Sequence, residues 1–405
     1  MNKFLKNKKF LVLLAVVLVV VAIFIRVKNT NNPSKVDNIK ADNIEVVKLP
    51  NMAVPRAGHS TIPLKDGRVL ILGDVSSSNV VKIAEIFDPK TNKFYRISDT
   101  NFSHRSPKLF MMQNGKVLII DFSGIEIFNP KTSKFERKYS DLLFNSQEAC
   151  ILKEQLSKKF TVNGSYSPYL FFMMSDALLL KNNKVFLDLG RYVKIYDMDK
   201  DVFSGTAKYL IVRGDERRVL LTDGKILVIG GLARKGFADE VESFNPKTNR
   251  FTIVGKIPFL KRIYKCILLK NGKIFILGSD TPTLIGSKSI IYYSNTVVIY
   301  DPKTNRSFIA GHTSMTKGHY DSVLLNDGKV LISEGYDIPS NSSFYEIYDP
   351  NTNKLKFYKA SYLKRDMSQL TVLNNGNVLI TGGIKTSLDS DLMPTSSAEI
   401  IAINK

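Results

Sequence analysis

The stretch AEIFDPKTNKF, at positions 84–94, recurs along this chain with small changes. Each copy begins with polar residues alternating with β-branched or aromatic ones, which is typical of a half-buried strand. Asx-Pro then ends the strand, because proline fixes φ and has no N–H to donate. The stretch therefore predicts a strand, a tight turn and a second strand. The further copies read IEIFNPKTSKF at 125–135, VESFNPKTNRF at 241–251, VVIYDPKTNRSF at 297–308 and YEIYDPNTNKL at 345–355.

A second motif alternates with the first and reads TDGKILVIGG at 222–231 or NNGNVLITGG at 374–383. Asx-Gly between apolar runs is a strong signal for a two-residue hairpin, since both turn residues need positive φ. The repeat has a period of about 50 residues, as expected for blades of four strands. The hairpin glycines, with an asparagine in the third copy, are Gly67, Gly115, Asn183, Gly224, Gly272, Gly328 and Gly376.

These features resemble the kelch repeat, and especially the bacterial kelch-like propellers related to the central domain of galactose oxidase. The resemblance covers nearly everything after residue 44. Its specific elements are Arg56 and His59 ahead of a first strand, the double glycine at 230–231 and 382–383, and the aromatic residue after the Asx-Pro turn. The chain departs from the family in having no tryptophan.

The two ends of the chain complement each other. The last repeat stops at SAEIIAINK, 397–405, which matches a third strand only. The segment NIEVVKLPNM, 43–52, has the pattern of the missing fourth strand, and pairing it there removes two exposed sheet edges. We therefore expect an all-β fold: a seven-bladed β-propeller of four-stranded blades over 44–405, closed by an N-terminal strand.

Residues 1–28 predict a membrane segment. Four lysines precede sixteen uninterrupted apolar residues, 10–25, a length between a signal-peptide core and a full bilayer span. No small-residue cleavage site follows, so an uncleaved signal anchor is favoured over a cleaved signal peptide, with 29–43 as a tether. The lysines place the N-terminus inside and the propeller on the extracytoplasmic side of the cell membrane, as a single-pass protein. Cys150 and Cys266 could pair there or remain free thiols.

The predicted binding surface is the face that carries the variable loops, because recognition normally uses irregular loops on a rigid scaffold. A formal net charge of +21 favours acidic partners, such as an anionic glycan or an acidic protein segment. Nucleic acid is disfavoured, since no nucleic-acid motif is present.

A basic residue stands ten or eleven positions before most hairpin glycines, where the innermost strand enters from the variable face. Guanidinium groups converging there suit carboxylates. The resemblance implies the same, because kelch domains that bind acidic peptides use arginines near this place. The alternative is that these residues brace neighbouring blades. The candidate ligand-binding residues are Arg56, Arg105, Arg213, Arg262, Lys317 and Arg365.

Two enzyme classes are weaker alternatives. A galactose-oxidase-like copper site needs two histidines, two tyrosines and a cross-linked cysteine, and here no cysteine has a recognisable cross-linking context. A mutarotase for sugar acids of the sialic acid type would hold the carboxylate with arginines and move a proton with Glu334 or Glu240. We expect a binding module with no catalytic residues, metal or cofactor. The four histidines are His59, His104, His312 and His319.

Overall fold

The computed structural model describes residues 42–74, 82–121, 124–140, 161–162, 165–166, 177–188, 192–200, 202–234, 236–280, 296–313, 321–333, 343–360, 365–385 and 393–403. Throughout these residues the ordered secondary structure is β, and none of them forms a helix long and apolar enough to cross a bilayer. The predicted membrane segment, 10–25, lies outside the described ranges. A compact unit begins at Asp42, two residues before the expected start of the propeller.

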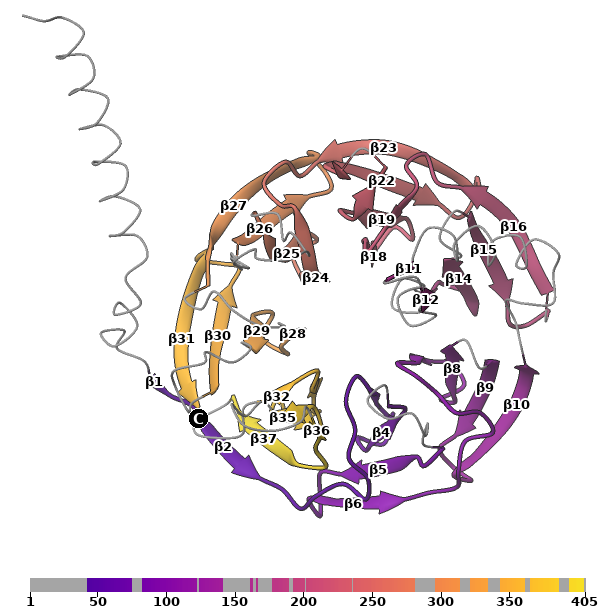
Figure 1. The fold of residues 1–405 in the computed structure, drawn as a ribbon, viewed down its shortest axis with the longest axis vertical. Helices are drawn as coiled ribbons and strands as arrows, with labels where there is room; N and C mark the ends of the chain where they lie inside the picture. The colour runs from indigo at the N-terminus through magenta and orange to yellow at the C-terminus, as the bar shows by residue number, and fades with distance from the viewer. Residues whose placement is uncertain are drawn as a thin grey trace, which may run out of the picture. The chain divides into compact units, whose positions relative to one another are not determined.

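The described strands include seven sheets in which four consecutive antiparallel strands follow one another outward. The first strands of neighbouring sheets contact each other, so they surround a common centre (Figure 1). In chain order the sheets are β3(60–63), β4(69–72), β5(85–88), β6(93–96); β7(108–111), β8(117–121), β9(124–129), β10(134–140); β13(177–179), β14(184–188), β15(192–197), β16(202–208); β18(217–220), β19(226–229), β22(240–245), β23(250–256); β24(262–268), β25(274–279), β26(296–301), β27(306–312); β28(321–324), β29(330–333), β30(343–349), β31(354–360); and β33(369–372), β34(378–381), β37(398–402) with β2(45–48). We number them sheet 1 to sheet 7.

The turns form as the repeated motif predicts. Asp88 accepts a hydrogen bond from the backbone N–H of Lys90 at 2.9 Å, which closes the Asx-Pro turn. Asn92 follows with φ of 55°, the left-handed conformation that asparagine tolerates. Ser133, the exception in sequence, has the same conformation with φ of 54°. A turn connects the third strand to the fourth in every sheet except sheet 7, whose fourth strand is the N-terminal β2.

The N-terminal strand completes sheet 7, as expected. β2 pairs antiparallel with β37, with Glu45 opposite Ala402 and Lys48 opposite Glu399. Figure 1 shows the indigo β2 beside the yellow β37. Within the predicted tether, β1(Asp42–Asn43) already pairs in parallel with β31 of sheet 6. The first described residues are therefore attached to the last two sheets.

The core lies between the sheets. Seven clusters of buried apolar side chains each combine residues from two consecutive sheets. One of them joins Leu379 and Ile400 of sheet 7 to Ile71 and Phe87 of sheet 1, so the sheets close into a ring. Burying these faces is the main stabilising term for such a fold.

Three small sheets lie outside the seven: β11(161–162) with β12(165–166), β17(213–214) with β20(232–233) and β21(236–237), and β32(365–366) with β35(384–385) and β36(393–394). The last two extend the segment before a first strand and the loop after a second strand. Most of the predicted variable loops, including 75–81, 281–295 and 334–342, lie outside the described residues.

Candidate binding site

Arg56 is held inside sheet 1 by a glutamate of the third strand. Its Nη2 lies 3.0 Å from Glu85 Oε1, and both side chains have no exposed surface. The same guanidinium donates to the carbonyl oxygens of Gly73 at 3.0 Å and Ile83 at 2.6 Å. Every direction of the planar group is thus used within one sheet. We call this arrangement an arginine brace.

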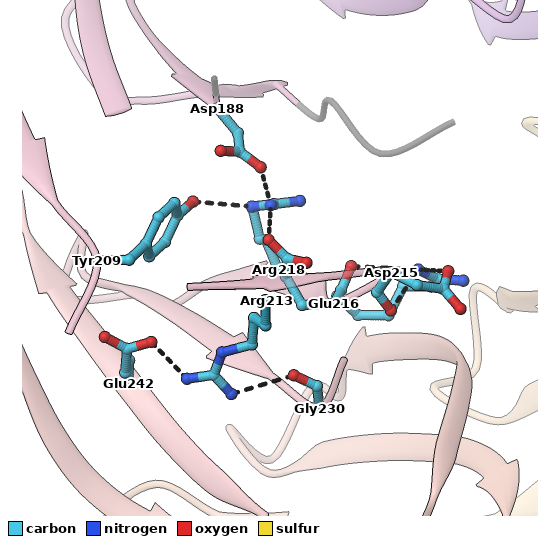
Figure 2. Close-up of polar contacts among 9 residues, drawn as sticks. Asp188, Tyr209, Arg213, Asp215, Glu216, Arg218, Gly230 and Glu242 are labelled. Atoms are coloured by element: carbon cyan, nitrogen blue, oxygen red, sulfur yellow. Dashed lines mark hydrogen bonds and ion pairs between the residues drawn. The ribbon is translucent and has the colours of Figure 1, made fainter. Parts of the chain in front are cut away.

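The brace recurs in two other sheets. Arg213 pairs with Glu242 and donates to the carbonyl of Gly230 at 3.1 Å (Figure 2). Arg365 lies 2.8 Å from Glu399, with side-chain exposures of 3% and 2%. Buried carboxylates already neutralise these three arginines, which leaves them little surface for a ligand.

In the braces of sheets 1 and 4 the glutamate also fixes the segment that enters the sheet. In sheet 1 its second oxygen accepts the backbone N–H of Ala53 at 2.6 Å. In sheet 4 Glu242 accepts the N–H of Leu210 at 2.7 Å. The brace therefore connects the incoming segment to the third strand of its own sheet, whereas the sequence alternative expected contacts between neighbouring blades.

The braced arginines differ from the other candidates in their distance along the sequence from the hairpin glycine. Arg56, Arg213 and Arg365 stand eleven residues before the hairpin glycine, whereas Arg105 and Arg262 stand ten before it. In sheet 2 the eleventh place belongs to His104. Lys317 lies outside the described residues.

In sheet 2, His104 occupies the brace position and pairs with the glutamate there. Its Nδ1 lies 2.9 Å from Asp121, and its Nε2 contacts Glu126. Hydrogen bonds to these two carboxylates outweigh burial and raise the pKa of His104 to about 9. Glu126 also accepts the N–H of Asn101 at 3.0 Å, as the other brace glutamates do for their own incoming segments. Counting the spacing would have identified this residue.

Arg262 stands one residue after the brace position, which Lys261 occupies in sheet 5, and this sheet also lacks the glutamate. The register of β25 and β26 puts Val298 opposite Ile276, the place that Glu85 occupies opposite Ile71. The Arg262 side chain is 39% exposed, and its Nε lies 3.5 Å from Asp215. Arg262 is therefore a candidate residue whose side chain stays accessible to solvent, and so does the side chain of its ion-pair partner Asp215.

Two more cations lie nearby on first strands, Arg217 on the neighbouring β18 and Lys265 on β24, the strand of Arg262. Arg217 donates to Asp215 at 3.0 Å and to the carbonyl of Tyr264 at 2.9 Å. Lys265 lies 2.6 Å from Asp321 of sheet 6. Their side chains are 30% and 40% exposed. We call Arg217, Arg262 and Lys265 the cation arc; it contains three positive charges against two carboxylates.

A buried ionic cluster surrounds Arg218, the residue after Arg217 on β18 (Figure 2). Arg218 pairs with Asp188 of sheet 3 and with Glu216 at 2.5 Å, and it also donates to the hydroxyl of Tyr209 at 3.3 Å. Glu216 Oε2 is buried with no hydrogen-bond partner among the described residues. Burial, with Asp188 nearby, raises the pKa of Glu216 to about 7. Sequence reasoning missed this cluster, although Arg217-Arg218 at the start of a first strand is an unusual pair.

The comparisons agree with this architecture. A family model described as the Kelch motif matches residues 217–258, the four strands of sheet 4. A solved fungal alcohol oxidase of the AA5 family, in complex with copper, has TM-score 0.61 and 11% identity, covering 89% of this chain and 76% of that chain. These findings show a Kelch motif at 217–258 within a propeller fold. No curated relative matches it.

The histidines of this kelch propeller do not form a metal site where they are described. His59 is buried, its Nε2 lies 2.8 Å from Thr381 Oγ1, and burial together with Arg56 lowers its pKa to about 3. His312 contacts Thr296, and His104 is held between two carboxylates as above. Among the described residues no three potential ligands form a group that could hold a metal ion. His319 lies outside the described residues.

The remaining candidates are structural or undescribed. Glu240 lies 3.8 Å from Lys256 on the neighbouring outer strand. Burial raises the pKa of the free thiol of Cys266 to about 12, so it is protonated at neutral pH. Glu334 and Cys150 lie outside the described residues.

Proposed function

We propose that this kelch propeller is a seven-bladed binding module that captures a carboxylate-rich ligand, an anionic glycan or an acidic protein segment, at the cation arc. The observation that supports this most is the contrast between Arg262, which is 39% exposed, and Arg56, which is fully buried. Arg262 stands outside the brace position, in a sheet that has Val298 in place of the glutamate, and its guanidinium is available at the ring of first strands.

The arc already contacts a carboxylate of the kind it would bind. Asp215 is 43% exposed and lies within ion-pair distance of both Arg217 and Arg262. A ligand carboxylate could displace it at little cost, because exposed ion pairs are worth only about 0–1 kcal/mol. The planar forks of two arginines would then hold the ligand in place of the protein's own acid.

We also propose that residues 10–25 hold the propeller at the cell membrane, on the extracytoplasmic side. The apolar run and its preceding lysines support this proposal. The test is fractionation of cells that carry the full chain, with protease added to intact cells. Propeller that stays soluble, or that resists protease until lysis, would overturn this part.

The binding proposal is tested with a hexaglutamate peptide and an oligogalacturonate as probes. Arg262→Glu with Lys265→Glu should abolish capture of both. The control is Lys247→Glu with Lys303→Glu, which makes the same change of charge in two Asx-Pro turns and should leave most of the affinity. Equal losses in the two double variants would show that only overall charge matters.

Polarimetry distinguishes the binding proposal from the sequence-based alternative, a sugar-acid mutarotase. Mutarotation of sialic acid above the spontaneous rate, lost in the Arg262 variant, would replace the binding proposal with an enzymatic one. An unchanged rate would leave the binding module.

A further inference from the structure

We infer that sheet 4 carries a second binding site, on the side of the Asx-Gly and Asx-Pro turns, for the oxyanion of a phosphate or sulfate ester. The site is a hollow of about 470 Å³ lined by Ser243, Asn245, Thr248, Arg250, Thr252 and Lys225, together with Val254. We call it the serine hollow. It is independent of the cation arc.

The hollow exists because one repeat has lost an isoleucine. Ser243 occupies the position after the brace glutamate in the third strand, where each of the other sheets has isoleucine. Those isoleucines pack into or against the apolar cluster shared with the next sheet, whereas the cluster between sheets 4 and 5 has no residue from this position. The equivalents are Ile86, Ile127, Ile195, Ile299, Ile347 and Ile400.

The groups that replace the apolar contact are hydrogen-bond donors. Register pairs Ser243 with Thr252 and Asn245 with Arg250 on neighbouring strands, so their side chains share one face of sheet 4. Lys225 reaches the same hollow from the hairpin between β18 and β19. The lining therefore has two cations, three hydroxyls and an amide, and no carboxylate.

These donors are available. Arg250 is exposed, and no ion pair or hydrogen bond of its guanidinium occurs among the described residues. The Ser243 hydroxyl likewise has no hydrogen-bond partner in the described part of the chain, although the residue is only 5% exposed. Lys225 is paired only with Asp223, at 3.1 Å on the exposed hairpin.

The chemistry of the lining selects the ligand class. Donors from three directions suit a tetrahedral oxyanion with several acceptor oxygens better than a planar carboxylate, and arginine with lysine is the usual pair for phosphate. The hollow is of the size that small-ligand sites have in proteins. A free phosphate ester and a phospholipid headgroup share this chemistry.

The test is titration calorimetry with inorganic phosphate and glucose 6-phosphate, and co-sedimentation with phosphatidylglycerol vesicles. Ser243→Ile restores the residue of the other repeats, so it should fold normally while weakening phosphate binding by at least about tenfold. Arg250→Gln should weaken binding to a similar extent. The matched control is Arg306→Gln, at the equivalent position of sheet 5, which should bind like wild type.

The inference is overturned by no phosphate binding to the wild-type chain, or by equal losses in the Arg250 and Arg306 variants. Binding of glucose 6-phosphate that Ser243→Ile removes assigns the site to soluble esters. Removal of vesicle binding alone by the same variant assigns it to headgroups. Binding of both probes that is unaffected by Ser243→Ile contradicts the site.

Discussion

Arg262 lies one residue after the brace position, in a sheet where Val298 stands in place of the glutamate that pairs with Arg56, Arg213 and Arg365 in their own sheets. Two adjacent positions before the first strands thus have different uses. At the brace position the arginine pairs with the glutamate, is buried and holds the sheet together. Arg262, at the next position of a sheet without the glutamate, is partly exposed to solvent, as are Arg217 and Lys265.

Removing a brace arginine should destabilise the propeller. Arg56→Met leaves Glu85 buried without its partner, which costs about 3–5 kcal/mol in comparable cases. The measurement is urea unfolding followed by tyrosine fluorescence, since the chain has no tryptophan, or by circular dichroism. Arg68→Met, which breaks the exposed pair with Asp66, is the control and should cost less than about 1 kcal/mol. Equal losses of unfolding free energy in the two variants would show that the buried brace stabilises the protein no more than an exposed ion pair does.

A carboxylate at the missing glutamate position should compete with the ligand for the Arg262 side chain. Val298→Glu puts a carboxylate where Glu85 stands in sheet 1, and we expect it to draw the guanidinium inward and to weaken capture of hexaglutamate, although no cation has been removed. Val298→Gln, which lacks the charge, is the control. If both variants bind like wild type, the valine does not release Arg262.

Stability should depend on pH through Glu216. Its pKa is about 7 in the folded protein against an ordinary value of 4.5, so the folded state binds the proton more tightly than the unfolded state does. The contribution is fully present below pH 4.5 and is lost as the pH rises through 7. Glu216→Gln should therefore flatten the fall in unfolding free energy between these values. His104, with a pKa of about 9, should still lower stability between pH 6.5 and 9 in both proteins. An unchanged slope below pH 7 would contradict the assignment.

Ring closure can be tested by cross-linking. Val46 and Ile401 lie opposite each other in β2 and β37, so cysteines at both positions should form a disulfide and raise the melting temperature. The control pair, Val47 and Ile401, points to opposite faces of the sheet and should not cross-link. Both pairs are made with Cys150 and Cys266 replaced by alanine. Failure of the first pair to oxidise would mean that the N-terminal strand does not close the ring.

Much of the fold follows from local sequence. Asx-Gly and Asx-Pro turns are set by the conformations of a few residues, so the order of strands and the closing role of 43–52 can be read from the chain. The braces could not be read in the same way. Whether an arginine is buried depends on a glutamate about 29 residues later in the third strand, as for Arg56 and Glu85, and on sheet register. The ionic cluster of Asp188 and Arg218 joins two sheets, and no local pattern predicts it.

The measurement that tests the central claim most directly is the affinity for hexaglutamate of Arg262→Met, taken together with its unfolding free energy. We expect binding to weaken by at least about tenfold, the loss typical of one charge-assisted contact, while stability changes by less than about 1 kcal/mol. A variant that binds as tightly as wild type but loses several kcal/mol of stability would show that Arg262 is one more structural arginine.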